Sequence, residues 1–179
     1  PLRLACVGRL EPAAKGQDLL LKILAQEPWR SYDLEVSFYG KGCAEENLRK
    51  LAKRLQLDTR VKFCGHVSDL EGLWSKHHAL IQPSRFEGLP LMIVEAMHCG
   101  RPVIVTDVAG NAELVEDGVT GFVAEAATER HLEKALARAW EQRHQWEQIG
   151  AAAAQAIRKL VPADPINVFA RRLLELAGK

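Results

Sequence analysis

The sequence has 179 residues, of which 47% are hydrophobic and 26% are charged, a composition typical of a globular domain with one core. Its 24 lysines and arginines nearly balance its 23 aspartates and glutamates, so a generally basic surface for nucleic acid is not indicated. No apolar run approaches the roughly 20 residues that a membrane-spanning helix requires. We therefore expect neither a nucleic-acid partner nor a transmembrane segment.

Short apolar runs typical of strands alternate with segments whose apolar residues recur every three or four positions, as in helices. Strands are predicted at 2–7, 33–39, 61–64, 79–82 and 103–106, with a small edge strand at 121–123. Helices are predicted at 18–26, 48–55, 70–76, 92–99 and 112–115, and in two later apolar stripes at 132–140 and 166–176.

This alternation predicts an α/β fold, a Rossmann-like parallel sheet with helices on both faces. We interpret residues 1–179 as a single domain in which 165–179 form a separate terminal helix. The chain begins at Pro1 directly on a predicted core strand, so we expect it to be a piece of a longer protein. Parallel sheets bind ligands beyond the carboxyl ends of their strands, and that edge is where functional residues are expected.

Two cations follow the first predicted strand. Arg9 lies within Gly8-Arg9-Leu10, and Lys15-Gly16 opens the first helix. A helix N-terminus favours an anion, and the two cations could clamp a diphosphate, although solvated surface cations would explain the same spacing. No G-x-G-x-x-G or G-x-x-x-x-G-K-[ST] motif follows the strand, which disfavours dinucleotide binding and phosphate-loop ATPases.

Two glutamates follow the fourth strand. Glu87 lies in the loop, whereas Glu95 lies in an apolar part of the next helix, a poor place for a carboxylate without a partner. The two hydroxyls of a ribose could satisfy Glu95, and so could a backbone group or an arginine. In the loop that contains His66, a nucleotide base could be read by the backbone, although an ordinary turn fits equally well. Gly110 and Asn111 begin another helix at the same edge.

In this order, these elements resemble the C-terminal domain of retaining GT-B-fold glycosyltransferases of family 4. The matching segments are Gly8-Arg9-Leu10 with Lys15-Gly16, Glu87-Gly88 with Glu95-Ala96-Met97, Gly100-Arg101-Pro102-Val103, and Glu113-Leu114-Val115 through Gly118-Val119-Thr120-Gly121. Seven residues separate the two glutamates, which is the family's Glu-x7-Glu pattern. The chain departs from the family at Pro90, which removes an amide donor, and at Ala109, where the glycine-rich loop is thinner.

The resemblance implies catalytic roles for Arg9, Lys15 and Glu87. Arg9 and Lys15 would clamp a donor's diphosphate and stabilise it as it leaves, and Glu87 would face the sugar ring. Glu95 would hold the ribose hydroxyls. The implied donor-binding positions are Gly8, Arg9, Lys15, His66, Gly88, Leu89, Leu91, Met92 and Glu95. The resemblance also implies no metal or other cofactor, which fits the lack of an Asp-x-Asp motif, since Arg9 and Lys15 would neutralise the diphosphate.

The family also implies a hexosyltransferase that uses a UDP- or GDP-sugar and a glycan or lipid-linked acceptor, as in polysaccharide or lipopolysaccharide biosynthesis. The acceptor would bind to an absent N-terminal domain, on which 165–179 would pack, and the chain alone would be inactive. Widely spaced cysteines favour a cytoplasmic protein, which could associate with the inner face of the membrane through the absent domain. Two alternatives stay open: a degenerate nucleotide-binding or interaction module, and a nucleotide-sugar epimerase.

Overall fold

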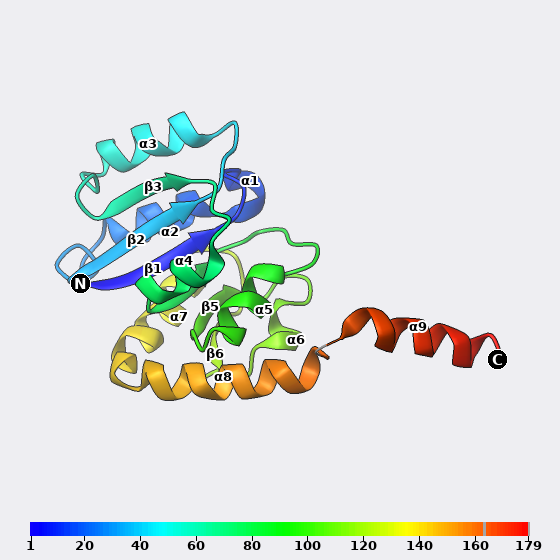
Figure 1. Ribbon diagram of the computed structural model, residues 1–179. Coiled ribbons are helices and arrows are strands. Elements are labelled where there is room, and N and C mark those ends of the chain that lie inside the picture. The colour runs from blue at the N-terminus through cyan, green and yellow to red at the C-terminus, as the bar shows by residue number, and fades with distance from the viewer. Residues whose placement is uncertain (163, 179) are drawn as a thin grey trace.

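The computed structural model describes residues 1–162 and 164–178, and its centre is one six-stranded sheet (Figure 1). The strands are β1 (Leu2–Val7), β2 (Leu34–Tyr39), β3 (Val61–Gly65), β4 (Ala79–Gln82), β5 (Val103–Thr106) and β6 (Gly121–Ala124). They lie in the order β3-β2-β1-β4-β5-β6, and every neighbouring pair is parallel. This confirms the predicted parallel sheet, including the edge position of the last strand.

Helices cover both faces of the sheet. They are α1 (Pro12–Lys15), α2 (Gln17–Leu24), α3 (Glu45–Arg54), α4 (Leu70–Lys76), α5 (Leu91–His98), α6 (Asn111–Leu114), α7 (Glu129–Glu141), α8 (Trp146–Leu160) and α9 (Pro165–Leu176), with a 3-10 turn at Arg143–Gln145. Helices α2, α3 and α7 bury their apolar side chains in one core cluster, whereas α4, α5 and α6 contribute to a second. The Rossmann-like α/β prediction is therefore confirmed.

Close packing joins the corner between α1 and α2 to the loop after β4. Gly16 has a φ of +65°, and a Cβ atom there would lie 1.9 Å from the carbonyl oxygen of Pro83, so only glycine fits. The amides of Arg85 and Phe86 both donate to the carbonyl oxygen of Ala14, at 2.8 and 2.9 Å. These contacts bring the segment after β1 against the segment that carries Glu87.

Helix α9 projects away from the body of the molecule (Figure 1). Its predicted apolar stripe is exposed along its length, at Ile166, Val168, Phe169, Leu173, Leu174 and Leu176. The sequence pattern thus predicted the helix correctly, but its apolar side chains contribute to neither core cluster. Within 1–162 and 164–178, no helix combines the length and the apolar character needed to cross a membrane.

Candidate functional site

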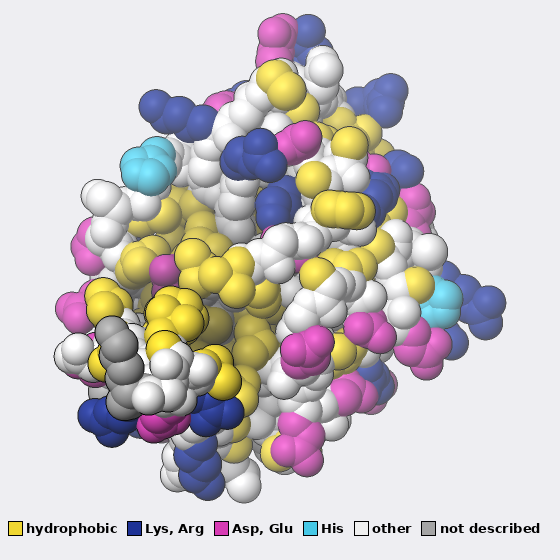
Figure 2. Space-filling model, turned by 90° about the vertical axis from the view of Figure 1, so that its right-hand side faces the viewer, with side chains coloured by type: hydrophobic (Ala, Val, Ile, Leu, Met, Phe, Trp, Pro, Cys, Tyr) yellow, Lys and Arg dark blue, Asp and Glu magenta, His cyan; other side chains and the backbone are white. Residues whose placement is uncertain are grey.

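A cleft of about 660 Å³ opens at the carboxyl edge of the sheet, where β1, β2 and β3 end beside α5. Its lining comprises Val7, Gly8, Arg9, Tyr39, Gly40, Lys41, His66, Val67, Ser68, Leu70, Met92 and Glu95. Figure 2 looks onto this edge and shows a hollowed face in which hydrophobic side chains lie beside lysine and arginine side chains. Five predicted site residues, Gly8, Arg9, His66, Met92 and Glu95, are therefore brought into one cleft.

Lys15 and Glu87 form a partly buried ion pair that is not part of this lining. Their Nζ and Oε2 atoms are 2.7 Å apart, and the two side chains are only 18% and 4% exposed. The aliphatic part of Lys15 passes Gly8, because a Cβ atom built on that glycine would lie 3.7 Å from the lysine Cδ. The pair therefore borders the cleft at Gly8.

The carboxylate of Glu87 accepts three hydrogen bonds from the described residues. Lys15 donates to Oε2, whereas the Gln82 amide and the Ser84 hydroxyl donate to Oε1 at 2.7 and 2.6 Å. Burial acts to raise the pKa of Glu87, but the hydrogen bonds from Lys15, Ser84 and Gln82 outweigh it, and the pKa lies below its ordinary value. The carboxylate is turned inward in this structure, and its expected contact with a sugar ring stays a prediction.

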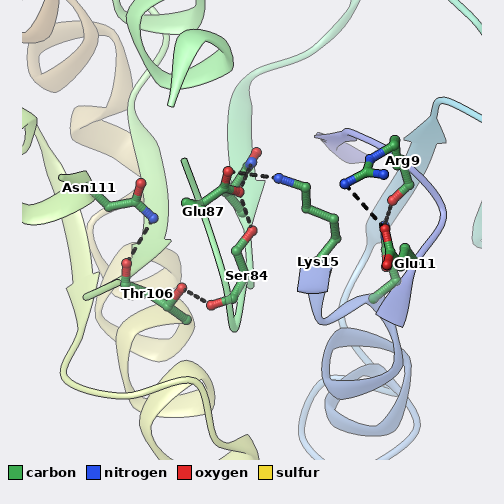
Figure 3. Close-up of polar contacts among 9 residues, drawn as sticks. Arg9, Glu11, Lys15, Ser84, Glu87, Thr106 and Asn111 are labelled. Carbon is green, nitrogen blue, oxygen red and sulfur yellow. Dashed lines mark hydrogen bonds and ion pairs between the residues drawn. The ribbon is translucent and has the colours of Figure 1, made fainter. Parts of the chain in front are cut away.

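Arg9, the second predicted cation, has a different environment. Its side chain is 75% exposed, and its Nη2 lies 3.3 Å from Oε2 of Glu11. The Gln17 side chain donates to the Arg9 carbonyl oxygen at 2.8 Å and so ties down the backbone rather than the guanidinium. Figure 3 shows Lys15 directed at Glu87 and Arg9 directed at Glu11. Each cation is thus paired with its own carboxylate, and their joint contact with a diphosphate stays a prediction.

Glu95 lies in α5 and faces the cleft. Its Oε2 atom is buried and has no hydrogen-bond partner among residues 1–162 and 164–178. Burial raises the pKa of this carboxyl group above its ordinary value. The residue as a whole is only partly buried and lines the cleft, so its carboxylate offers a site for a ligand that donates hydrogen bonds. A vicinal diol fits that requirement.

The remaining predicted donor positions lie outside the cleft lining. Gly88, Leu89 and Leu91 are exposed, and the amide of Leu91 donates to the carbonyl oxygen of Leu89 at 2.9 Å. Pro90 is the N-cap of α5, directly before the first helical residue, Leu91. The expected contacts of these amides with a ligand stay predictions.

Sequence reasoning did not select Tyr39 and Lys41, which also line the cleft. A signal for them was available, since Gly40-Lys41-Gly42 follows the second strand directly and must lie at the carboxyl edge. It also did not select Gln82, the last residue of β4, whose burial is a tertiary property. Across the part of the chain that the structure describes, no group of three His, Cys, Asp or Glu side chains is placed to hold a metal.

Comparison with known sequences points to one family. The model for glycosyl transferases group 1 matches residues 1–142. An uncharacterized glycosyltransferase of Haemophilus influenzae is 33% identical over 123 residues, which are 68% of this chain and 35% of that protein. O-antigen chain mannosyltransferase B of Escherichia coli is 32% identical over 123 residues, 66% of this chain and 32% of that protein. The chain spans about a third of the length of these relatives.

A solved structure agrees over nearly the whole chain. The Anabaena protein Alr3699/HepE, crystallised in complex with UDP, superposes with a TM-score of 0.84 at 28% identity. The match covers 97% of this chain and 48% of that one. A second crystal structure of the same Anabaena protein is a complex with UDP-glucose. The six-stranded sheet and its helices therefore occur as about half of a larger molecule.

Proposed function

Because the chain belongs to the group 1 glycosyl transferases and has the fold of one GT-B domain, we propose that it is the donor-binding half of a retaining glycosyltransferase. The enzyme transfers a hexose-type sugar from a UDP- or GDP-sugar to a glycan or lipid-linked acceptor. The observation that carries this proposal is the cleft in which Gly8, Arg9 and Glu95 lie together. The UDP-glucose bound to Anabaena HepE favours uridine as the nucleoside.

Each part of a nucleotide-sugar has a matching surface in and beside the cleft. The carboxylate of Glu95 accepts hydrogen bonds from the ribose hydroxyls. The base lies against the apolar side chains of Val67 and Leu70, beside His66. The diphosphate extends past Gly8, where the lack of a side chain permits close approach, toward Arg9 and the bordering Lys15.

The two cations act on the charge that develops during transfer. When the bond between the anomeric carbon and the diphosphate oxygen breaks, the electron pair stays on the leaving nucleoside diphosphate. Lys15, which is already held in place, stabilises that charge without reorganisation at the moment of reaction, whereas Arg9 must turn from Glu11 toward it. Arg9 and Lys15 supply two positive charges, and the proposed mechanism requires no metal. Glu87 is the third catalytic residue and faces the sugar ring. The transferred sugar keeps its anomeric configuration.

The acceptor binds to a second domain of the longer protein. Support comes from the lengths of the relatives, of which this chain covers 32–48%. The exposed apolar side chains of α9 pack on that domain, and this chain alone transfers no sugar. The O-antigen chain mannosyltransferase among the relatives supports a role in polysaccharide synthesis. The proposed location is the cytoplasm, at the inner face of the membrane.

The experiment is calorimetric titration of the 179-residue chain with UDP, GDP and ADP in the presence of a chelator. One diphosphate should bind the wild type and should bind more weakly to Glu95→Ala and Lys15→Ala. Lys50→Ala is the matched control, because Lys50 is exposed on α3 and pairs with Glu46 at 2.6 Å.

If neither this chain nor the longer protein binds any of the three diphosphates, the proposal is wrong and the chain is a degenerate module. Conversion of a free nucleotide-sugar without an acceptor would identify an epimerase instead.

A further inference from the structure

A chain of buried and partly buried hydrogen bonds runs from α6 to Glu87 (Figure 3). The Asn111 amide donates to the carbonyl oxygen of Thr106 at 3.0 Å, and the Thr106 hydroxyl donates to the carbonyl oxygen of Ser84 at 2.5 Å. The Ser84 hydroxyl then donates to Oε1 of Glu87 at 2.6 Å. Ser84, Thr106 and Asn111 are all buried. The backbone that carries Ser84 is therefore tied to β5 and α6 independently of any ligand.

The donors divide the two oxygens of Glu87 between them. Gln82 and Ser84 both bond Oε1, and Lys15 bonds Oε2 at 2.7 Å. Because a carboxylate only accepts, the Gln82 amide must turn its Nε2 toward Glu87. With Oε1 occupied from two sides, the carboxylate cannot rotate without breaking both bonds. Its Oε2 is consequently held toward Lys15.

This arrangement matters for Lys15 because a lysine side chain is intrinsically mobile. Fixing its four-carbon stem costs conformational entropy, which a binding site otherwise loses when the ligand arrives. Here the stem already lies against Gly8, and the ammonium group already lies on Glu87. The exposed Arg9 side chain has no comparable support.

We propose that Gln82 and Ser84 are positioning residues for Lys15, which, through Glu87, hold the ammonium group where it meets the donor's diphosphate. This inference rests on the proposed function, because it assumes a diphosphate ligand. It goes further by assigning the placement of the cation to two buried residues that line no part of the cleft. The lysine reaches the ligand, and the glutamine and serine act through the carboxylate.

The first test compares a ligand that reaches Lys15 with one that does not. We titrate the full chain and its variants Ser84→Ala and Gln82→Met with UDP and with uridine. If the wild type prefers GDP, the two ligands are GDP and guanosine. We expect each variant to bind the diphosphate about threefold to tenfold more weakly and the nucleoside with unchanged affinity. The loss should disappear in the Lys15→Ala background, because no ammonium group is left to position.

The matched control is Thr120→Val, which removes a buried hydroxyl that bonds Glu116 and lies outside this network. It should leave the ratio of diphosphate to nucleoside affinity unchanged. Equal weakening of both ligands by Ser84→Ala and Gln82→Met would reveal a merely structural role and overturn the proposal. So would a loss that persists in the Lys15→Ala background, or diphosphate binding that neither variant weakens.

A second measurement requires no ligand and separates this proposal from the proposed function. Lysines are labelled with limiting acetic anhydride and quantified by mass spectrometry, with Lys50 as the internal reference. Ser84→Ala should raise the labelling of Lys15 at least twofold, because its ammonium group is released from Glu87. Unchanged labelling overturns the positioning role even if the wild type binds UDP. Raised labelling supports that role even if no diphosphate binds, a result that would count against the proposed function alone.

Discussion

Lys15 and Arg9 have the same predicted role but lie in opposite surroundings. Lys15 is 18% exposed and pairs with a carboxylate that accepts two further hydrogen bonds. Arg9 is 75% exposed, and its partner Glu11 is itself accessible to water. A buried charge whose partner is removed is strongly destabilising, whereas an exposed pair contributes at most about 1 kcal/mol. Substitutions of the two cations should therefore differ in their effects on protein stability and ligand affinity, and in how strongly salt changes those effects.

The largest effect is expected for Lys15→Met. It leaves Glu87 buried without its counter-charge, so the free energy of unfolding should fall by about 3 kcal/mol. UDP affinity should fall about 30-fold, equivalent to about 2 kcal/mol. Urea unfolding and calorimetry measure the two quantities. The control is Lys50→Met, at an exposed ion pair on α3, which should change the free energy of unfolding by less than about 0.5 kcal/mol. An equally small change for Lys15→Met would contradict the expected difference between Lys15 and the exposed Arg9.

The second effect concerns pH. The pKa of Glu87 lies below its ordinary value of 4.5 because hydrogen bonds from Lys15, Ser84 and Gln82 outweigh the opposing effect of burial. The resulting stability is fully present above pH 4.5 and is lost as the pH falls through the lower, folded-state pKa. The stability advantage of the wild type over Glu87→Gln should therefore narrow between pH 5 and the acid limit of folding. An advantage that stays constant over that range would contradict the ionised, paired carboxylate.

A smaller effect is expected at Glu95, on the nucleoside side of the cleft. Glu95→Gln should weaken UDP and uridine equally, by roughly tenfold, because the lost acceptor serves the ribose in both. Since burial raises the pKa of Glu95, wild-type affinity for uridine should begin to fall, as the pH decreases, at a higher pH than for an ordinary glutamate. Calorimetry at several pH values measures the affinity loss of Glu95→Gln and the pH dependence of uridine binding by the wild type. Selective loss of UDP would assign Glu95 to the diphosphate instead.

The smallest effect is expected for Arg9→Ala. UDP should bind about threefold more weakly at low salt, and this difference should shrink as the ionic strength rises, since exposed charges are screened. The free energy of unfolding should stay within about 0.5 kcal/mol of the wild type. Glu11→Ala should act in the opposite direction by freeing the guanidinium group. A salt-independent loss as large as that of Lys15→Met would show that Arg9 becomes buried when the ligand binds.

The sequence by itself determined the parallel sheet and the edge at which function is expected. Strand and helix periodicities differ, and the carboxyl ends of parallel strands meet at one edge, so local patterns place Gly8, His66 and Glu95 correctly. All six strands begin and end within one residue of the predicted limits. The same patterns predicted an amphipathic helix at 166–176 but contain nothing about what its apolar side chains contact.

Only the tertiary structure decided how the charged residues are partnered. Lys15 and Glu87 are 72 positions apart, and nothing in their local sequences distinguishes a buried pair from two solvated charges. The close contact at Gly16 and the hydrogen bonds to Ala14 bring the two loops together, and Gln82 and Ser84 then saturate one carboxylate oxygen. Burial and hydrogen-bond satisfaction are properties of the packed chain. They explain why one predicted cation is held against a buried carboxylate and the other forms an exposed ion pair.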